Sequence, residues 1–167
     1  MHRPPDLCDP ARSGHLILSA FGGHSLTWRH TVCHVGDHAG DADEVRADAT
    51  LVIQSALVGD GDGVVGTFDS VVDRRGMGAA YDVAWHLAGE MVGGGTLHGP
   101  WRLDFPDIDD ASYDARWVAR FVSAYVNDDA STATALFTVA LVDGRLPDCL
   151  LTLAGSTVAT LRRRESA

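Results

Sequence analysis

The sequence predicts a mainly α-helical single domain built from two similar three-helix halves, each preceded by a short extended segment. Three observations favour this fold class. Apolar residues recur at helical spacing over most of the chain from about residue 43. A stretch rich in glycine and proline over 93–106 interrupts this spacing near the middle. Three short sequences of the first half return, in the same order, in the second half.

The returning sequences indicate an internal duplication. The pairs are Ser55–Asp60 with Ser123–Asp128, Val72–Arg75 with Val142–Arg145, and Asp82–Gly89 with Asp148–Gly155. Three short helices expose an apolar face that they cannot cover alone, so the two copies are expected to pack together. The small residues at the ends of the third pair, Gly89 and Gly155, are expected to allow close helix approach there.

The N-terminal region is expected to be largely non-helical. Residues 1–14 contain three prolines and predict a flexible tail. The apolar run 16–21, followed by two glycines and an alternating stretch over 25–35, predicts a hairpin at the start of the first half. Gly36–Asp43 then predict a loop. The first half as a whole is assigned to residues 15–92.

The helices of the first half are expected at about 43–58, 63–74 and 79–92. Asp43 and Glu44 suit a helix start, and the glycines of 59–63 end the first helix. The alternating Asp and Gly of this turn do not form a calcium loop, because Val71 stands where an EF-hand needs a glutamate.

A linker over 93–106 separates the halves, because three glycines and two prolines cannot continue a helix. The second half, residues 107–164, is expected to contain helices at 112–127, at 130–142 and from Pro147 onward. Ser112 is a candidate N-cap and Gly144 a candidate C-terminal cap. Asp82 and Asp148 are interpreted as N-caps of the last helix of each half.

Composition and charge exclude several classes of partner. The net charge of −10 argues against nucleic acid, whose phosphates need clustered cations, and the terminal Arg162–Arg164 is interpreted as a solvated helix end. No apolar stretch is long enough for a signal peptide or a membrane span. Three cysteines without a CxxC pattern indicate free thiols. We therefore expect a soluble cytoplasmic protein.

The most unusual local feature is a cluster of histidines around a cysteine. His30, His34 and His38 recur every fourth residue, and Cys33 lies three residues after His30. Imidazole and thiolate are ligands that zinc prefers, and four of them make a closed site. The spacing matches no recognised zinc signature, so a set of surface histidines is the competing interpretation.

Two charged pairs and two tryptophans are the other candidate site residues. Asp73 with Arg75 recurs as Asp143 with Arg145, which indicates either a cap with an ion pair at a helix end or matching charges across a cleft. Trp85 and Trp117 are candidates to line a pocket or an interface between the halves.

The sequence identifies no catalytic residue. It favours a small cytosolic helical protein with a binding or regulatory role, non-enzymatic, that contacts a protein partner or a second copy of itself. The alternative is a metal-binding protein, either a sensor or a metalloenzyme, that uses His30, Cys33, His34 and His38 with zinc.

Overall fold

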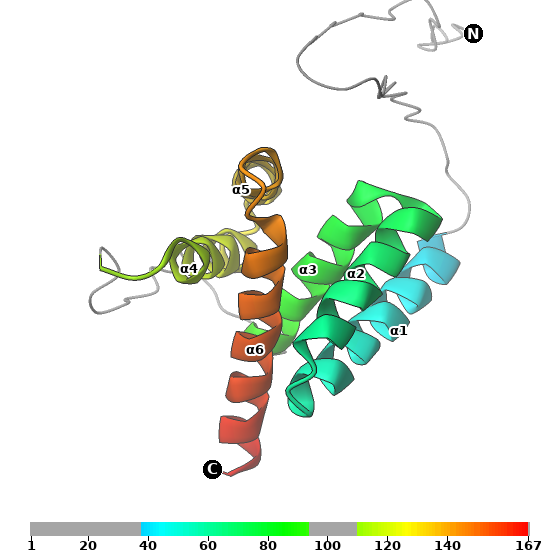
Figure 1. Ribbon diagram of the computed structural model, residues 1–167, viewed down its shortest axis with the longest axis horizontal. Helices are drawn as coiled ribbons and strands as arrows, with labels where there is room; N and C mark the ends of the chain where they lie inside the picture. The colour runs from blue at the N-terminus through cyan, green and yellow to red at the C-terminus, as the bar shows by residue number, and fades with distance from the viewer. Residues whose placement is uncertain (1–37, 94–109, 167) are drawn as a thin grey trace, which may run out of the picture. The chain divides into compact units, whose positions relative to one another are not determined.

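The structure, a computed structural model, describes residues 38–93 and 110–166, and these residues contain helices and turns without a strand (Figure 1). The helices are α1 (His38–Leu57), α2 (Gly61–Arg75), α3 (Met77–Val92), α4 (Tyr113–Val126), α5 (Ala130–Val142) and α6 (Leu146–Glu165). The all-helical fold class is confirmed for this part of the chain. Within it, no helix is both long and apolar enough to cross a bilayer. The predicted tail and hairpin, and all of the predicted linker except Gly93, lie outside the described residues.

The loop predicted at Gly36–Asp43 is wrong from His38 onward, because α1 begins there. Asp41 lies in the first turn of the helix, where a carboxylate interacts favourably with the helix dipole. Glu44 and Asp48 also reach arginines of α2, so contacts distant in sequence stabilise the start of α1. The other five helices begin and end within about two residues of the predicted positions.

The caps are partly as predicted. Ser112 accepts a hydrogen bond from the amide of Ala115, as expected of an N-cap. Asp82 and Asp148 are not N-caps, because α3 begins after Gly76 and α6 after Arg145. Gly76 has φ of +83° and lets α3 start directly after α2, which places Asp82 well inside the helix.

The core lies around α3 and α6. Val83 and Leu87 of α3 and Leu153 of α6 are fully buried, and α3 contacts α1, α2, α4 and α6. In Figure 1 α6 runs from top to bottom of the view while α4 and α5 are seen nearly end-on, so the axis of α6 is steeply inclined to both. The ring of Phe121 on α4 makes edge-on contacts with the rings of Tyr81 and Trp85 on α3, at 6.0 and 6.1 Å between centroids. An aromatic cluster therefore connects α4 to the rest of the core.

Two of the three terminal arginines, although exposed, bind the ends of other helices. Arg162 donates from Nη2 to the carbonyl of Leu57 at 2.6 Å, and Arg164 donates to the carbonyls of Glu90 and Met91. These carbonyls belong to the last turns of α1 and α3, where carbonyl groups have no N–H donor within their own helix. The end of α6 therefore caps two helices of the first half.

Arg164→Ala is expected to lower the free energy of unfolding by about 1 kcal/mol, because the last carbonyls of α3 lose charged donors. Urea unfolding followed by circular dichroism at 222 nm measures this loss. Arg163→Ala is the matched control, since Arg163 shares the arginine run and its side chain makes no hydrogen bond to another described residue. Its cost should stay within about 0.5 kcal/mol. Equal losses in the two variants would contradict the capping role.

The two halves share one turn geometry. After α1 the amide of Asp60 donates to the carbonyl of Ser55 at 2.9 Å, and after α4 the amide of Asp129 donates to Ala124 at the same distance. Asp60 and Asp129 then serve as N-caps of α2 and α5. The match is one residue out of register with the repeated sequences, which pair Asp60 with Asp128.

The third helices of the halves differ in their surroundings. A Cβ added at Gly89 would lie 2.7 Å from the Tyr125 hydroxyl, whereas one added at Gly155 would meet nothing within 4 Å. Close approach thus occurs at Gly89, through a side chain, and not at Gly155. Internal duplication is not confirmed by these comparisons and stays a prediction.

Candidate functional site

A cleft of about 620 Å³ lies between α1 and α3, and we call it the acidic cleft. Three carboxylate side chains line it, from Asp41, Asp82 and Glu90. The rest of the lining is Ala42, Val45, Arg46, Trp85, His86, Gly89, Gly93 and Tyr125. An ordinary small-ligand site has a comparable volume.

Two aromatic rings form one wall of the acidic cleft. The rings of Trp85 on α3 and Tyr125 on α4 lie 4.8 Å apart between centroids and are inclined by 60°. Gly89 makes this arrangement possible, because any larger residue there would collide with the Tyr125 hydroxyl. Both rings are only partly buried, so the cleft exposes aromatic surface next to carboxylates.

Burial and neighbouring charges shift the pKa of Asp82 in the acidic cleft. Partial desolvation raises the pKa of Asp82 above its usual value; the negative charge of Asp41 adds to this and the nearby Arg75 opposes it. On the same helix, Nε2 of His86 lies 3.5 Å from Oε1 of Glu90. The acidic cleft therefore carries negative charge, and water solvates its Asp82 carboxylate only in part.

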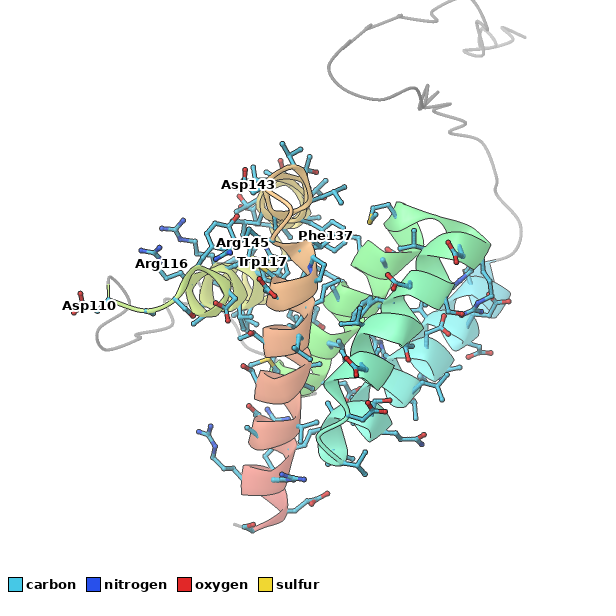
Figure 2. All side chains as sticks on the ribbon, viewed as in Figure 1. Asp110, Arg116, Trp117, Phe137, Asp143 and Arg145 are labelled. Carbon is cyan, nitrogen blue, oxygen red and sulfur yellow. The ribbon has the colours of Figure 1, made fainter. Side chains whose placement is uncertain are left out.

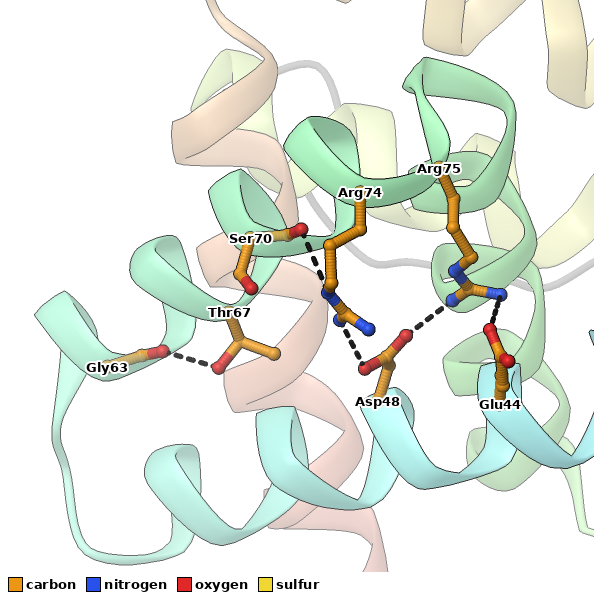
Figure 3. Close-up of polar contacts among 7 residues, drawn as sticks. All are labelled: Glu44, Asp48, Gly63, Thr67, Ser70, Arg74 and Arg75. Carbon is orange, nitrogen blue, oxygen red and sulfur yellow. Dashed lines mark hydrogen bonds and ion pairs between the residues drawn. The ribbon is translucent and has the colours of Figure 1, made fainter.

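Arg75, a sequence-predicted site residue, lies in an ion-pair network beside the cleft (Figure 3). Asp48 is buried, with 4% of its surface exposed, and its two carboxylate oxygens accept from Arg74 and Arg75. The Arg74 contact is 2.9 Å long, and Glu44 pairs with Arg75 at 3.5 Å. Asp73 is exposed and is not an ion-pair partner of Arg75.

Asp143 and Arg145 lie in the turn between α5 and α6 (Figure 2). Both contact Tyr113, the first residue of α4. The Tyr113 hydroxyl donates to Oδ2 of Asp143 at 3.3 Å, and the Arg145 guanidinium lies 5.6 Å from the Tyr113 ring centroid. Desolvation and the neighbouring Asp143 carboxylate raise the pKa of Tyr113. This pair attaches the turn to the start of α4.

The two predicted tryptophans have different positions. Trp85 lines the acidic cleft, while Trp117 is buried at 3% exposure and donates from Nε1 to the carbonyl of Leu136 at 3.0 Å. Phe121 lies between them, with an edge-on contact of 6.1 Å to Trp85. One tryptophan is thus accessible to a ligand and the other holds α4 on α5.

The predicted zinc ligands His30, Cys33 and His34 lie outside the described residues, and His38 is the first residue of α1. Across residues 38–93 and 110–166, no three His, Cys, Asp or Glu side chains are grouped to hold a metal ion. The proposed cluster is therefore neither supported nor contradicted.

Cys149 is a free, fully buried thiol. Burial, with the carboxylates of Asp114 and Asp148 adding to its effect, raises the pKa of this thiol to about 11. A thiol held in its neutral form is a poor nucleophile. Cys149 is not part of the lining of the acidic cleft, and the described residues of that lining include no serine, threonine, cysteine or lysine.

Sequence reasoning missed most of the cleft residues and the Asp48 network. The signal for the cleft was present, because Asp82, His86 and Glu90 recur every fourth residue and so share one face of a helix. No such signal marks Asp48, whose partners are 26 and 27 residues away.

No family model, curated protein or solved structure matches this chain.

Proposed function

We propose that this protein is a small cytosolic, non-enzymatic binding protein with a regulatory role, which recognises a protein partner through an arginine side chain bound in the acidic cleft. The observation that carries the proposal is the combination of Trp85 and Tyr125 with three carboxylates in one cavity. Among the described residues, that cavity is lined by no serine, threonine, cysteine or lysine, which favours binding over catalysis.

Arginine fits these groups better than other side chains do. Its guanidinium is flat, stacks on an aromatic face and donates two parallel hydrogen bonds to a carboxylate. Trp85 offers the ring, and Asp82 and Glu90 lie three residues before it and five after it on the same helix. A cation over an aromatic ring contributes about 0.5–2 kcal/mol, depending on desolvation.

N-acetyl-arginine amide is the probe that tests the cleft. In a ¹H–¹⁵N spectrum of the full chain, the indole N–H signal of Trp85, assigned with Trp85→Phe, is expected to shift on titration with millimolar affinity. N-acetyl-citrulline amide, which has the same shape without the charge, should leave it in place. Equal shifts with both compounds, or none with arginine, would overturn the proposal.

Two double variants distinguish binding in the acidic cleft from attraction by the overall negative charge of the chain. Asp82→Asn with Glu90→Gln is expected to weaken arginine binding at least roughly tenfold, because two charged acceptors are lost. Asp62→Asn with Asp73→Asn removes the same charge from exposed residues outside the cleft and should change affinity by less than about twofold. A similar loss in both double variants would point to non-specific attraction.

The metal-binding alternative rests on His30, Cys33, His34 and His38, as inferred from the sequence. Elemental analysis of the purified full chain, with and without His30→Ala and His34→Ala together, tests it. Stoichiometric zinc that the double variant loses would support it, and its absence from the unmodified protein would end it.

Duplication of one three-helix module is retained as a proposal about origin. It is supported by the Asp-capped turn that follows both α1 and α4. If the duplication is real, the acidic cleft arose in only one of the two copies. Gly89 lies against the Tyr125 ring, whereas the equivalent Gly155 has no aromatic ring against it.

A further inference from the structure

One residue in the lining of the acidic cleft does not suit a guanidinium ligand. Arg46 of α1 belongs to that lining, although a cation there repels the bound arginine side chain. Its guanidinium is exposed, and among the described residues it pairs with Asp43, which is exposed too, at 3.4 Å. An exposed pair of this kind contributes little to stability. Arg46 can therefore exchange Asp43 for an anionic group of a ligand at little cost.

Helices α1 and α3 contact one another and run in the same direction. At their starts, Glu44 of α1 pairs with Arg75, which comes directly before Gly76 and the first residue of α3. At their ends, Arg162 and Arg164 of α6 bind the last carbonyls of α1 and α3 respectively. A residue further along α1 therefore lies further along the acidic cleft.

The acidic cleft thus has a negative end, with a positive group further along it. Asp41 and Asp82 lie in the first two turns of their helices, close enough for the charge of Asp41 to raise the pKa of Asp82. Arg46 comes five residues after Asp41, a rise of about 7.5 Å along the helix. The guanidinium carbon and the carboxyl carbon of an extended arginine are about 7 Å apart, because six bonds join them. The spacing of opposite charges in the cleft therefore matches the two ends of one arginine residue.

We propose that the arginine bound in the acidic cleft is the last residue of its chain, with its guanidinium against Asp41 and Asp82 and its terminal carboxylate paired with Arg46. A guanidinium binds a carboxylate through two parallel charge-assisted hydrogen bonds, which a neutral backbone carbonyl does not allow. An internal arginine would leave Arg46 facing the ligand without an anion to bind. The inference rests on the proposed function and specifies its partner as a protein that ends in arginine.

The group next to the carboxylate favours a chain end over free arginine. Free arginine carries an ammonium group on the same carbon as its carboxylate, so binding would bring that cation close to Arg46. At the end of a chain an uncharged amide takes its place. Free arginine therefore serves as a comparison in the test.

N-acetyl-arginine and N-acetyl-arginine amide differ only in the terminal carboxylate. Each is titrated into the full chain at about 0.15 M salt and followed by the indole N–H signal of Trp85. The acid is expected to bind at least about fivefold more tightly, since it gains a charge-assisted contact that the nearby Glu90 carboxylate only partly offsets. The net charge of −10 alone predicts the reverse order. Free arginine is expected to bind less tightly than the acid.

Arg46→Gln is expected to remove this preference, so that the acid binds no more tightly than the amide. The affinity for the amide should change by less than about threefold, because it has no anion for Arg46 to bind. Arg163→Gln is the matched control, since it removes the same charge from an exposed residue outside the cleft lining, and it should keep the preference. Circular dichroism shows that each variant is folded.

The outcomes separate this inference from the proposed function. An amide that binds as tightly as the acid would overturn the terminal carboxylate and leave arginine recognition standing, whereas no binding of either compound would end both. A preference that survives Arg46→Gln, or that Arg163→Gln removes equally, would overturn the role of Arg46. So would a gain of about tenfold or more in amide affinity on Arg46→Gln, because Arg46 would then obstruct the cleft. Tighter binding of free arginine than of the acid would overturn the chain end as the ligand.

Discussion

Asp48→Asn is expected to lower the free energy of unfolding by about 3 kcal/mol, the low end of what removing one partner of a buried ion pair costs. Asp48 is buried and its carboxylate accepts from both Arg74 and Arg75. Asparagine has nearly the same shape but no charge, so the two guanidinium groups would lose their shared counter-ion. The low end applies because Arg74 is half exposed and water can solvate it.

Urea unfolding followed by circular dichroism measures this effect, with all variants at one protein concentration. Asp43→Asn is the control, because Asp43 lies on the same helix and pairs with Arg46 at 3.4 Å in an exposed position. Its cost should stay below about 0.5 kcal/mol. If the two variants lost stability equally, the Asp48 network would be ordinary surface charge and the start of α1 would need another explanation.

Phe121→Ala is expected to cost about 3–5 kcal/mol, the range for truncating a buried aromatic residue. Phe121 is fully buried, and its ring contacts those of Trp85, Trp117 and Tyr81. The cavity left behind would be bordered by large, stiff rings that cannot move in to fill it. This loss is a large share of the stability of a small domain, typically about 5–15 kcal/mol.

The same unfolding measurement, together with near-ultraviolet circular dichroism of the tryptophans, checks this result. Phe121→Leu should cost less than about 1.5 kcal/mol, since it keeps most of the volume. Leu51→Ala, at a position 51% exposed, should change stability by no more than about 0.5 kcal/mol. A cost for Phe121→Ala as small as that of Leu51→Ala would mean that the aromatic cluster does not hold α4 in place.

The sequence reveals only part of the acidic cleft. Trp85 was identified as a possible pocket residue from its type alone, and it lines the acidic cleft. Tyr125 could not be assigned to the same cleft, because 40 residues separate it from Trp85 and only the packing of α4 on α3 brings the rings together. The charged pairs show the same limit, since Arg75 binds Asp48 and Glu44 of another helix and not its neighbour Asp73.

The sequence by itself determined the helices and most of their ends, because apolar spacing, glycines and capping side chains act within a few residues of one another. Only the tertiary structure decided which charges meet and which glycine lies against an aromatic ring. Those outcomes depend on contacts between side chains of helices that are far apart in the sequence. No pattern within a single segment predicts such contacts.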